Sequence, residues 1–141
     1  MKINILTKVK ADYKTVWERF DKDLFLKLSP PFPPVKLLRF DGCLKGNKVQ
    51  LELNFLIFKQ RWDALIIENG QDANQYYFID EGTKLPFFIS KWHHKHTIRK
   101  SGNGTEIIDA IEFSSPFGYL IYPVLYLQFL YRRPIYRKYF T

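Results

Sequence analysis

Between residues 35 and 113 the chain is a series of short strand-like runs joined by turn residues, with no helix-like segment between them. The runs at 49–55 and 105–113 alternate apolar and polar side chains, which is the pattern of a strand with one buried face. Four further runs are separated by Gly, Asn and Asp and lie at 35–40, 61–68, 76–79 and 88–100. Because short strands joined by tight turns pair with their neighbours, this segment predicts an antiparallel sheet.

Two turns are indicated most sharply. Asn103-Gly104 lies between two alternating runs, and this dipeptide is a strong hairpin signal. The sequence Asp80-Glu81-Gly82 predicts a turn that ends the run at 76–79.

The N-terminal segment predicts one strand and two short helices. Residues 2–10 alternate, which predicts a strand with one buried face. Asp12 is placed to cap a helix that contains Val16 and Phe20, and a second short helix is expected at 21–28. The proline-rich stretch at 29–34 cannot be regular helix or central strand, so it predicts an extended connector.

The C-terminal segment predicts one long helix. Ser114 and Ser115 precede Pro116, which is the pattern of an N-cap followed by proline at the first helical position. Nearly every residue at 119–131 is apolar, so this part of the helix is expected to be buried on all sides, with a kink or a lost first turn at Pro123. Past Arg132 the pattern becomes amphipathic and basic.

This order of elements predicts an α+β fold in a single domain spanning residues 1–141. A curved antiparallel sheet of about six to seven strands would grip the long C-terminal helix, with two short helices after the first strand. Since a curved sheet need not touch the helix everywhere, a cavity can remain between them.

Composition excludes several function classes. Cys43 is the only cysteine, so no internal disulfide forms, and a cytoplasmic location is expected. This cysteine lies among turn residues without a visible base, which predicts a passive thiol. The formal net charge is +8, but the basic residues are scattered, and no nucleic-acid motif or glycine-rich phosphate loop is present. The apolar stretch at 117–130 is shorter than the roughly 20 residues of a spanning helix. No membrane segment, nucleic-acid partner or cofactor is therefore expected.

The whole pattern resembles the START-like, helix-grip (SRPBCC) superfamily, which includes pollen-allergen-type carriers, lipid-transfer domains and polyketide cyclases. It looks most like the small bacterial ligand-binding or cyclase/dehydratase-type branch. The segments that carry the resemblance are Val-Trp-Glu-Arg-Phe at 16–20, Trp62, Pro-Phe-Phe at 86–88, Lys-Trp-His-His-Lys-His at 91–96, Gly-Thr-Glu-Ile-Ile-Asp at 104–109, Pro-Phe-Gly at 116–118 and Tyr-Arg at 131–132. The resemblance implies a deep apolar cavity.

The densest polar group lies at 92–96, Trp-His-His-Lys-His. On a strand, Trp92, His94 and His96 share one face, and the hairpin partner can present Asp109 to the same face. Three interpretations stay open. The groups can form a satisfied structural network, a histidine oriented by Asp109 can act as general acid or base, or His94 and His96 can bind a metal with Asp109 as third ligand. The candidate catalytic set is His94, His96 and Asp109, and no metal site is assigned.

The inward strand positions and one side of the helix supply the expected cavity wall. The residues expected there are Trp62, Phe88, Trp92, Ile107, Ile111, Tyr122, Tyr126 and Phe129.

The sequence therefore predicts the binding of a small apolar or amphipathic ligand, such as a lipid, polyketide-like or aromatic molecule. The alternative is a cyclase, dehydratase or isomerase-type enzyme that uses a His–Asp pair in the cavity, and binding without catalysis is the preferred prediction. A third hypothesis is contact with an anionic membrane surface through basic residues of the C-terminal helix. These are Arg132, Arg133, Arg137 and Lys138.

Overall fold

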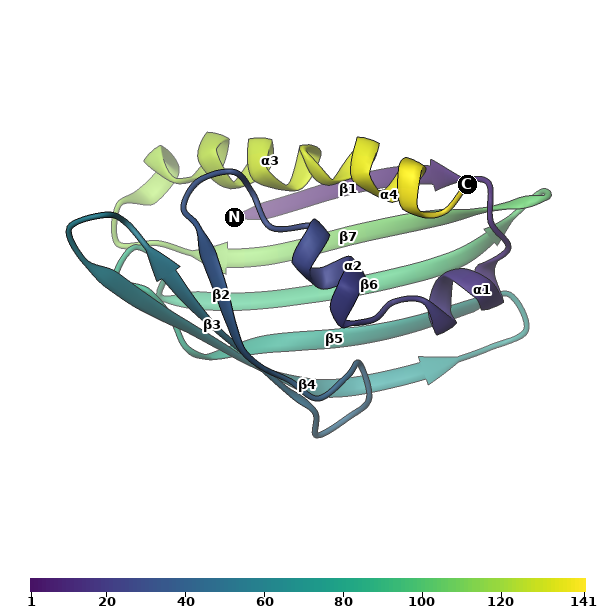
Figure 1. Ribbon diagram of the computed structural model, residues 1–141, viewed down its shortest axis with the longest axis horizontal. Coiled ribbons are helices and arrows are strands. Elements are labelled where there is room, and N and C mark those ends of the chain that lie inside the picture. The colour runs from purple at the N-terminus through teal and green to yellow at the C-terminus, as the bar shows by residue number, and fades with distance from the viewer.

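A computed structural model describes all 141 residues, and its framework is one seven-stranded sheet (Figure 1). The strands are β1 (Lys2–Val9), β2 (Val35–Phe40), β3 (Lys48–Asn54), β4 (Lys59–Gln71), β5 (Gln75–Lys84), β6 (Lys91–Ser101) and β7 (Gly104–Ser114). The helices are α1 (Tyr13–Glu18), α2 (Lys22–Lys27), α3 (Tyr122–Leu130) and α4 (Arg132–Tyr139), with a 3₁₀ helix, η1 (Gly118–Leu120), before α3.

The order of strands across the sheet follows the chain, with one exception. From β2 to β7 each strand pairs with the next, and β1 lies beside β7 at the edge. Every pair is antiparallel, as the turn signals predict. In the β6–β7 hairpin Ser101 pairs with Gly104, so the turn residues are Gly102 and Asn103, one position earlier than predicted. Gly102 has a φ of +56°, as the first central position of a type II′ turn requires.

The two C-terminal helices lie along β1 and β7 and divide the core into two halves (Figure 1). Under α3, Leu125 and Phe129 pack in one cluster with Ile111 of β7. Under α4, Tyr136 packs in a second cluster with Ile107, to which α1 and α2 each add a buried residue. The sheet thus holds the helix pair along its length, which confirms the predicted α+β architecture.

The start of the C-terminal helix differs from the prediction. Pro116 does not open a helix but lies in a turn before η1, and α3 begins only at Tyr122. Pro123 lies in the first turn of α3, where its missing N–H has no intrahelical partner to lose. The helix is then interrupted at Tyr131, because Pro134 has no N–H to donate to the carbonyl four residues earlier.

The apolar segment at 119–131 is not buried on all sides, which is a second correction. Leu125 and Phe129 are buried, but Val124 and Leu127 are 52% and 64% exposed. The sheet covers one side of α3, and the other side faces away from the molecule (Figure 1). None of the helices has the length and apolar character needed to cross a bilayer.

Candidate functional site

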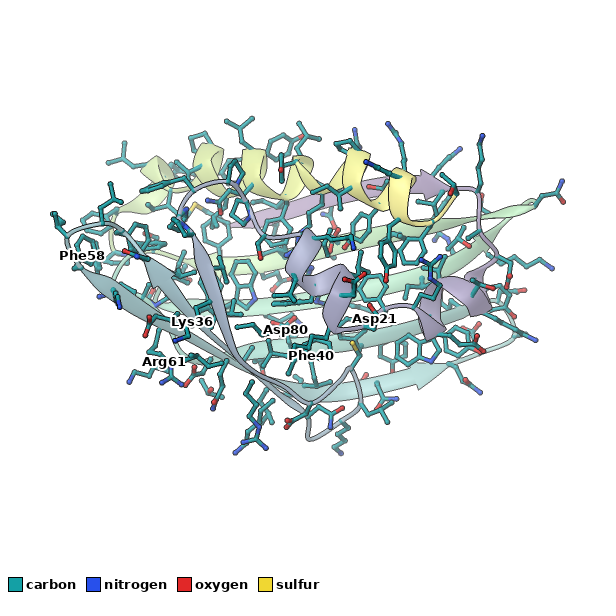
Figure 2. The ribbon with its side chains drawn as sticks, viewed as in Figure 1. Asp21, Lys36, Phe40, Phe58, Arg61 and Asp80 are labelled. Atoms are coloured by element: carbon teal, nitrogen blue, oxygen red, sulfur yellow. The ribbon has the colours of Figure 1, made fainter.

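A cavity of about 330 Å³ is lined by residues of strands β2 to β6, of α2 and of α3. Of its 31 lining residues, 22 are hydrophobic, so most of the wall is apolar. The polar residues that the sheet contributes to this wall are Asp80, His94 and His96. Asp80 lies near the middle of the molecule in Figure 2, so these groups are deep inside it.

Four polar side chains from three adjacent central strands meet on the inner face of the sheet. We call Asp80, His94, His96 and Asp109 the His–Asp cluster. In the strand register His94 lies opposite Asp80 and His96 lies opposite Asp109. The hydrogen bonds run along the diagonals: His94 donates from Nε2 to Asp109 Oδ1 at 2.8 Å, and His96 donates from Nε2 to Asp80 Oδ2 at 2.7 Å. The two imidazole rings stack between the carboxylates, with centroids 3.5 Å apart.

Two further residues support the cluster. Trp92, on the same face of β6, donates its Nε1–H to Asp80 Oδ1 at 3.0 Å, so both oxygens of Asp80 are engaged. Arg132 places Nη1 3.8 Å from Asp109 Oδ1 and lies over the ring of Phe129. A buried carboxylate needs such partners, because an unpaired charge in an apolar interior is strongly unfavourable.

Burial and neighbouring charges change the pKa values of the two aspartates and of His96 in the cluster. Burial alone would raise the pKa of both aspartates, but for Asp80 the hydrogen bond from His96 and the charge of His94 reverse that effect. For Asp109 the hydrogen bond and charge of His94 act in the same way, with Arg132 adding to them. The pKa of each carboxyl is therefore lower than usual, whereas burial and the neighbouring His94 lower the pKa of His96 to about 4.

These shifts fix the hydrogen-bonding role of His96 at neutral pH. A carboxylate only accepts hydrogen bonds, so neutral His96 carries its proton on Nε2 and a lone pair on Nδ1. His96 Nδ1 and Asp109 Oδ2 are both buried and have no hydrogen-bond partner. The cluster therefore keeps two unpaired acceptors, and a donor group of a ligand could satisfy the one on His96, which lines the cavity.

The residues expected at the site divide into two groups. His94 and His96 lie in the cavity wall, together with Trp62, Phe88, Trp92 and Phe129. Asp109 is outside the wall and contacts it through His94.

Four expected cavity residues lie elsewhere. Ile107 and Ile111 are in the cores beneath α4 and α3, because these helices cover β7 and leave the cavity to β2–β6. Tyr122 stacks near Phe113, and Tyr126 is partly exposed.

The sequence pattern did not indicate Asp80, which accepts hydrogen bonds from both His96 and Trp92 in the cluster. It placed a turn at Asp80-Glu81-Gly82, but β5 continues without a break to Lys84. A signal was present, since Tyr76, Phe78 and Asp80 alternate in phase and share a face. Because Asp80, Glu81 and Gly82 have the composition of a turn, they hid this strand alternation.

Two residues predicted as peripheral are part of the cavity wall. Arg132, expected on the basic outer surface, has a side chain only 17% exposed and turns toward Asp109. Cys43, expected in a loop, lines the cavity, and burial raises the pKa of its thiol to about 12. That thiol is therefore protonated at neutral pH and unsuited to nucleophilic attack.

A metal could be offered a donor set different from the predicted one. Asp80, rather than Asp109, joins His94 and His96, and the ligand atoms of these three lie within 4.8 Å of one another. Two imidazoles and a carboxylate suit zinc or iron. A cation would have to replace the 2.7 Å contact between His96 and Asp80, however, so the arrangement favours a hydrogen-bonded polar cluster over a metal site.

Comparison with known proteins identifies the fold. No family model and no curated protein sequence matches the chain. Protein Ms6760 from Mycobacterium smegmatis superposes with a TM-score of 0.71 at 14% identity, over 99% of this chain and 90% of that one. Norcoclaurine synthase from Thalictrum flavum, in complex with dopamine and hydroxybenzaldehyde, superposes with a TM-score of 0.59 at 12% identity, over 96% of this chain and 86% of that one. The Zhui aromatase/cyclase of a Streptomyces species superposes with a TM-score of 0.57 at 16% identity, over 82% of this chain and 68% of that one.

The chain therefore has the helix-grip fold of these solved structures, as the sequence resemblance predicted. At these identities the likeness establishes the fold and leaves substrate and reaction open.

The lowered pKa of His96 predicts a pH-dependent stability. Unfolded His96 takes up a proton near pH 6.5 and the folded residue only near pH 4, so between these values the unfolded state holds more protons. The free energy of unfolding, measured by urea denaturation, should therefore fall by about 1 to 2 kcal/mol from pH 7 to pH 5.

Two matched variants separate the contribution of His96 to this pH dependence from those of other groups. His96→Gln should remove most of the loss between pH 7 and pH 5, whereas His93→Gln, on the opposite face of the same strand, should keep it. Identical pH profiles for His96→Gln and the unmodified protein would show that His96 is not held neutral.

Proposed function

We propose that the chain binds a small amphipathic ligand, with an apolar body in the cavity and a hydroxyl or amine against the His–Asp cluster. The observation that carries the proposal is a mostly apolar cavity wall that contains buried polar groups, one of which, His96, keeps an unpaired acceptor. Binding pockets for small molecules commonly have this composition, since apolar contacts supply affinity and a few polar groups fix orientation.

The cavity size supports a compact ligand. Its volume of about 330 Å³ is near the lower end of the roughly 300–1,000 Å³ range of ligand pockets. Aromatic side chains from four strands and α3 line it, among them Trp62, Phe78, Trp92 and Phe129. Flat aromatic or fused-ring molecules can stack against such walls, which favours them over long lipid chains.

The unpaired atoms define the polar group of the ligand. Nδ1 of neutral His96 only accepts hydrogen bonds, and His96 lines the cavity, whereas Asp109 lies outside the wall. A ligand that donates a hydrogen bond, such as a phenol or an amine, would satisfy Nδ1 of His96, whereas a bare hydrocarbon would leave it unpaired. Norcoclaurine synthase, which shares the fold, holds the aromatic amine dopamine in its solved complex, and that chemistry is compatible with the class proposed for this chain.

Filling the cavity should abolish binding. Ala64 lines the cavity on β4, so Ala64→Phe would place a ring in the ligand volume. We expect isothermal calorimetry to show binding of 2-naphthol by the unmodified protein and at least a tenfold weaker affinity for Ala64→Phe.

The matched control is Ala110→Phe, because Ala110 follows the inward-facing Asp109 and lies on the outer face of the sheet. It should bind 2-naphthol like the unmodified protein. Equal affinities for all three proteins, or no binding by any, would contradict a ligand site at the cavity.

A second candidate function is acid–base catalysis in the same cavity. The observation that favours it is a neutral imidazole with a free lone pair, held between two ionised carboxylates. Such a group can take a proton from carbon beside a carbonyl, which is the chemistry that cyclases, dehydratases and isomerases share.

Solvent exchange tests this candidate directly. The protein should accelerate deuterium incorporation from D₂O into 2-tetralone, read by mass spectrometry, because this bicyclic ketone has acidic hydrogens beside its carbonyl. His96→Gln should lose the acceleration and His93→Gln should keep it. An exchange rate that His96→Gln leaves unchanged would exclude His96 as the base and leave ligand binding as the function.

A further inference from the structure

One end of the molecule carries apolar side chains that nothing covers. The β3–β4 connection holds Leu56 and Ile57, which are 80% and 91% exposed, and the segment after β7 holds Leu120, which is 76% exposed. Three exposed phenylalanines lie beside them. We call these six residues the apolar rim: Leu56, Ile57, Phe58, Phe87, Phe117 and Leu120.

Strand pairing brings the rim together from three distant segments. Lys59 pairs with Asn54, so the β3–β4 tip lies at the end of the sheet where β7 also ends, at Ser114 opposite Lys91. Figure 2 shows Phe58 at this end, far from α1. Ring contacts join the segments, with Phe87 5.8 Å from Phe58 and 5.9 Å from Phe117. Single exposed apolar residues are common, but a connected group of this kind indicates an interaction surface.

The backbone projects the tip outward under strain. Leu56 has a φ of +75°, in the left-handed region where glycine is favoured and a leucine side chain is disfavoured. This conformation presents Leu56 and Ile57 to solvent rather than to the neighbouring phenylalanines. Strain of this sort persists where the local geometry serves a function.

The charge around the rim selects its partner. The segments 54–60, 83–91 and 115–128, which carry the rim, contain Lys59, Lys84 and Lys91 and no Asp or Glu. All three lysines are exposed, although Lys59 also lies 3.6 Å from Glu52. A second copy of the chain would bring these like charges together across a dimer interface. An anionic bilayer instead offers apolar depth for the rim and phosphate or carboxylate groups for the lysines.

From these observations we propose that the apolar rim docks the protein on an anionic lipid bilayer. Leu56, Ile57 and Leu120 would enter the interfacial region, with the lysines at headgroup level. This surface lies at the opposite end of the C-terminal helix pair from the basic residues of α4, so it is a different membrane contact from the one that the sequence suggested.

The rim is continuous with the cavity. Phe55 and Phe88 line the cavity. Phe55 stacks on Phe58 of the rim at 5.2 Å, and Phe88 contacts Phe87 edge to face at 5.3 Å. An apolar ligand could thus pass between bilayer and cavity along apolar side chains. Transfer of a ligand through the rim rests on the proposed function, whereas docking on the bilayer does not.

Vesicle co-sedimentation tests the proposal. The unmodified protein should sediment with phosphatidylcholine vesicles that contain phosphatidylserine, and much less with phosphatidylcholine alone or at high salt. Ile57→Asp removes an apolar anchor and adds a negative charge, so it should lower the partition coefficient at least about tenfold.

The control is Leu44→Asp, because Leu44 is 55% exposed in the β2–β3 connection and is not part of the rim. It should sediment like the unmodified protein. Equal sedimentation of Ile57→Asp and Leu44→Asp would overturn the proposal. So would a dimer, seen by light scattering, that Ile57→Asp dissociates while no variant binds vesicles. Because Ile57 lies outside the cavity wall, Ile57→Asp should still bind 2-naphthol, which separates failure of docking from failure of the ligand site.

Discussion

Two carboxylates lie in the middle of the sheet, and each accepts a hydrogen bond from a histidine on the central strand β6. This exchange along the diagonals allows Asp80 and Asp109 to be ionised at 9% and 1% exposure. It also ties β5, β6 and β7 together through side chains, in addition to their backbone ladder. Removing one partner would leave an uncompensated buried charge, which typically costs about 3 to 5 kcal/mol. The four residues of the His–Asp cluster therefore depend on one another, and the loss of any one of them would destabilise the others.

The position of the helices determines what the rest of the sheet can do. Because α3 and α4 cover β1 and β7, the inner face over β2–β6 is left to line a cavity rather than to fill a core. The same one-sided packing leaves the outer side of α3 exposed, next to the apolar tips of the β3–β4 and β5–β6 connections. Cavity and apolar rim are thus two consequences of one arrangement.

The sequence predicted the local elements well, because strand alternation and turn residues act over a few positions. It also brought His94, His96 and Asp109 to one face, since the β6–β7 hairpin is local. It failed where distant packing decides the outcome. Asp80 has the composition of a turn residue in the sequence, but it pairs with His94 of β6, and β5 continues past Gly82. The exposure of Leu127 could not be predicted either, because an all-apolar helix gives no sign of which side the sheet covers.

The central claim is that His96 is a neutral imidazole that donates from Nε2 to Asp80 and keeps a free lone pair on Nδ1. Long-range ¹H–¹⁵N correlation spectra of the histidine rings report the protonation of each nitrogen directly. At pH 7 we expect the His96 spectrum of a neutral ring protonated on Nε2, with Nδ1 shifting when 2-naphthol is added. A doubly protonated imidazolium, or a neutral ring with its proton on Nδ1, would contradict the structure of the cluster and the ligand chemistry inferred from it.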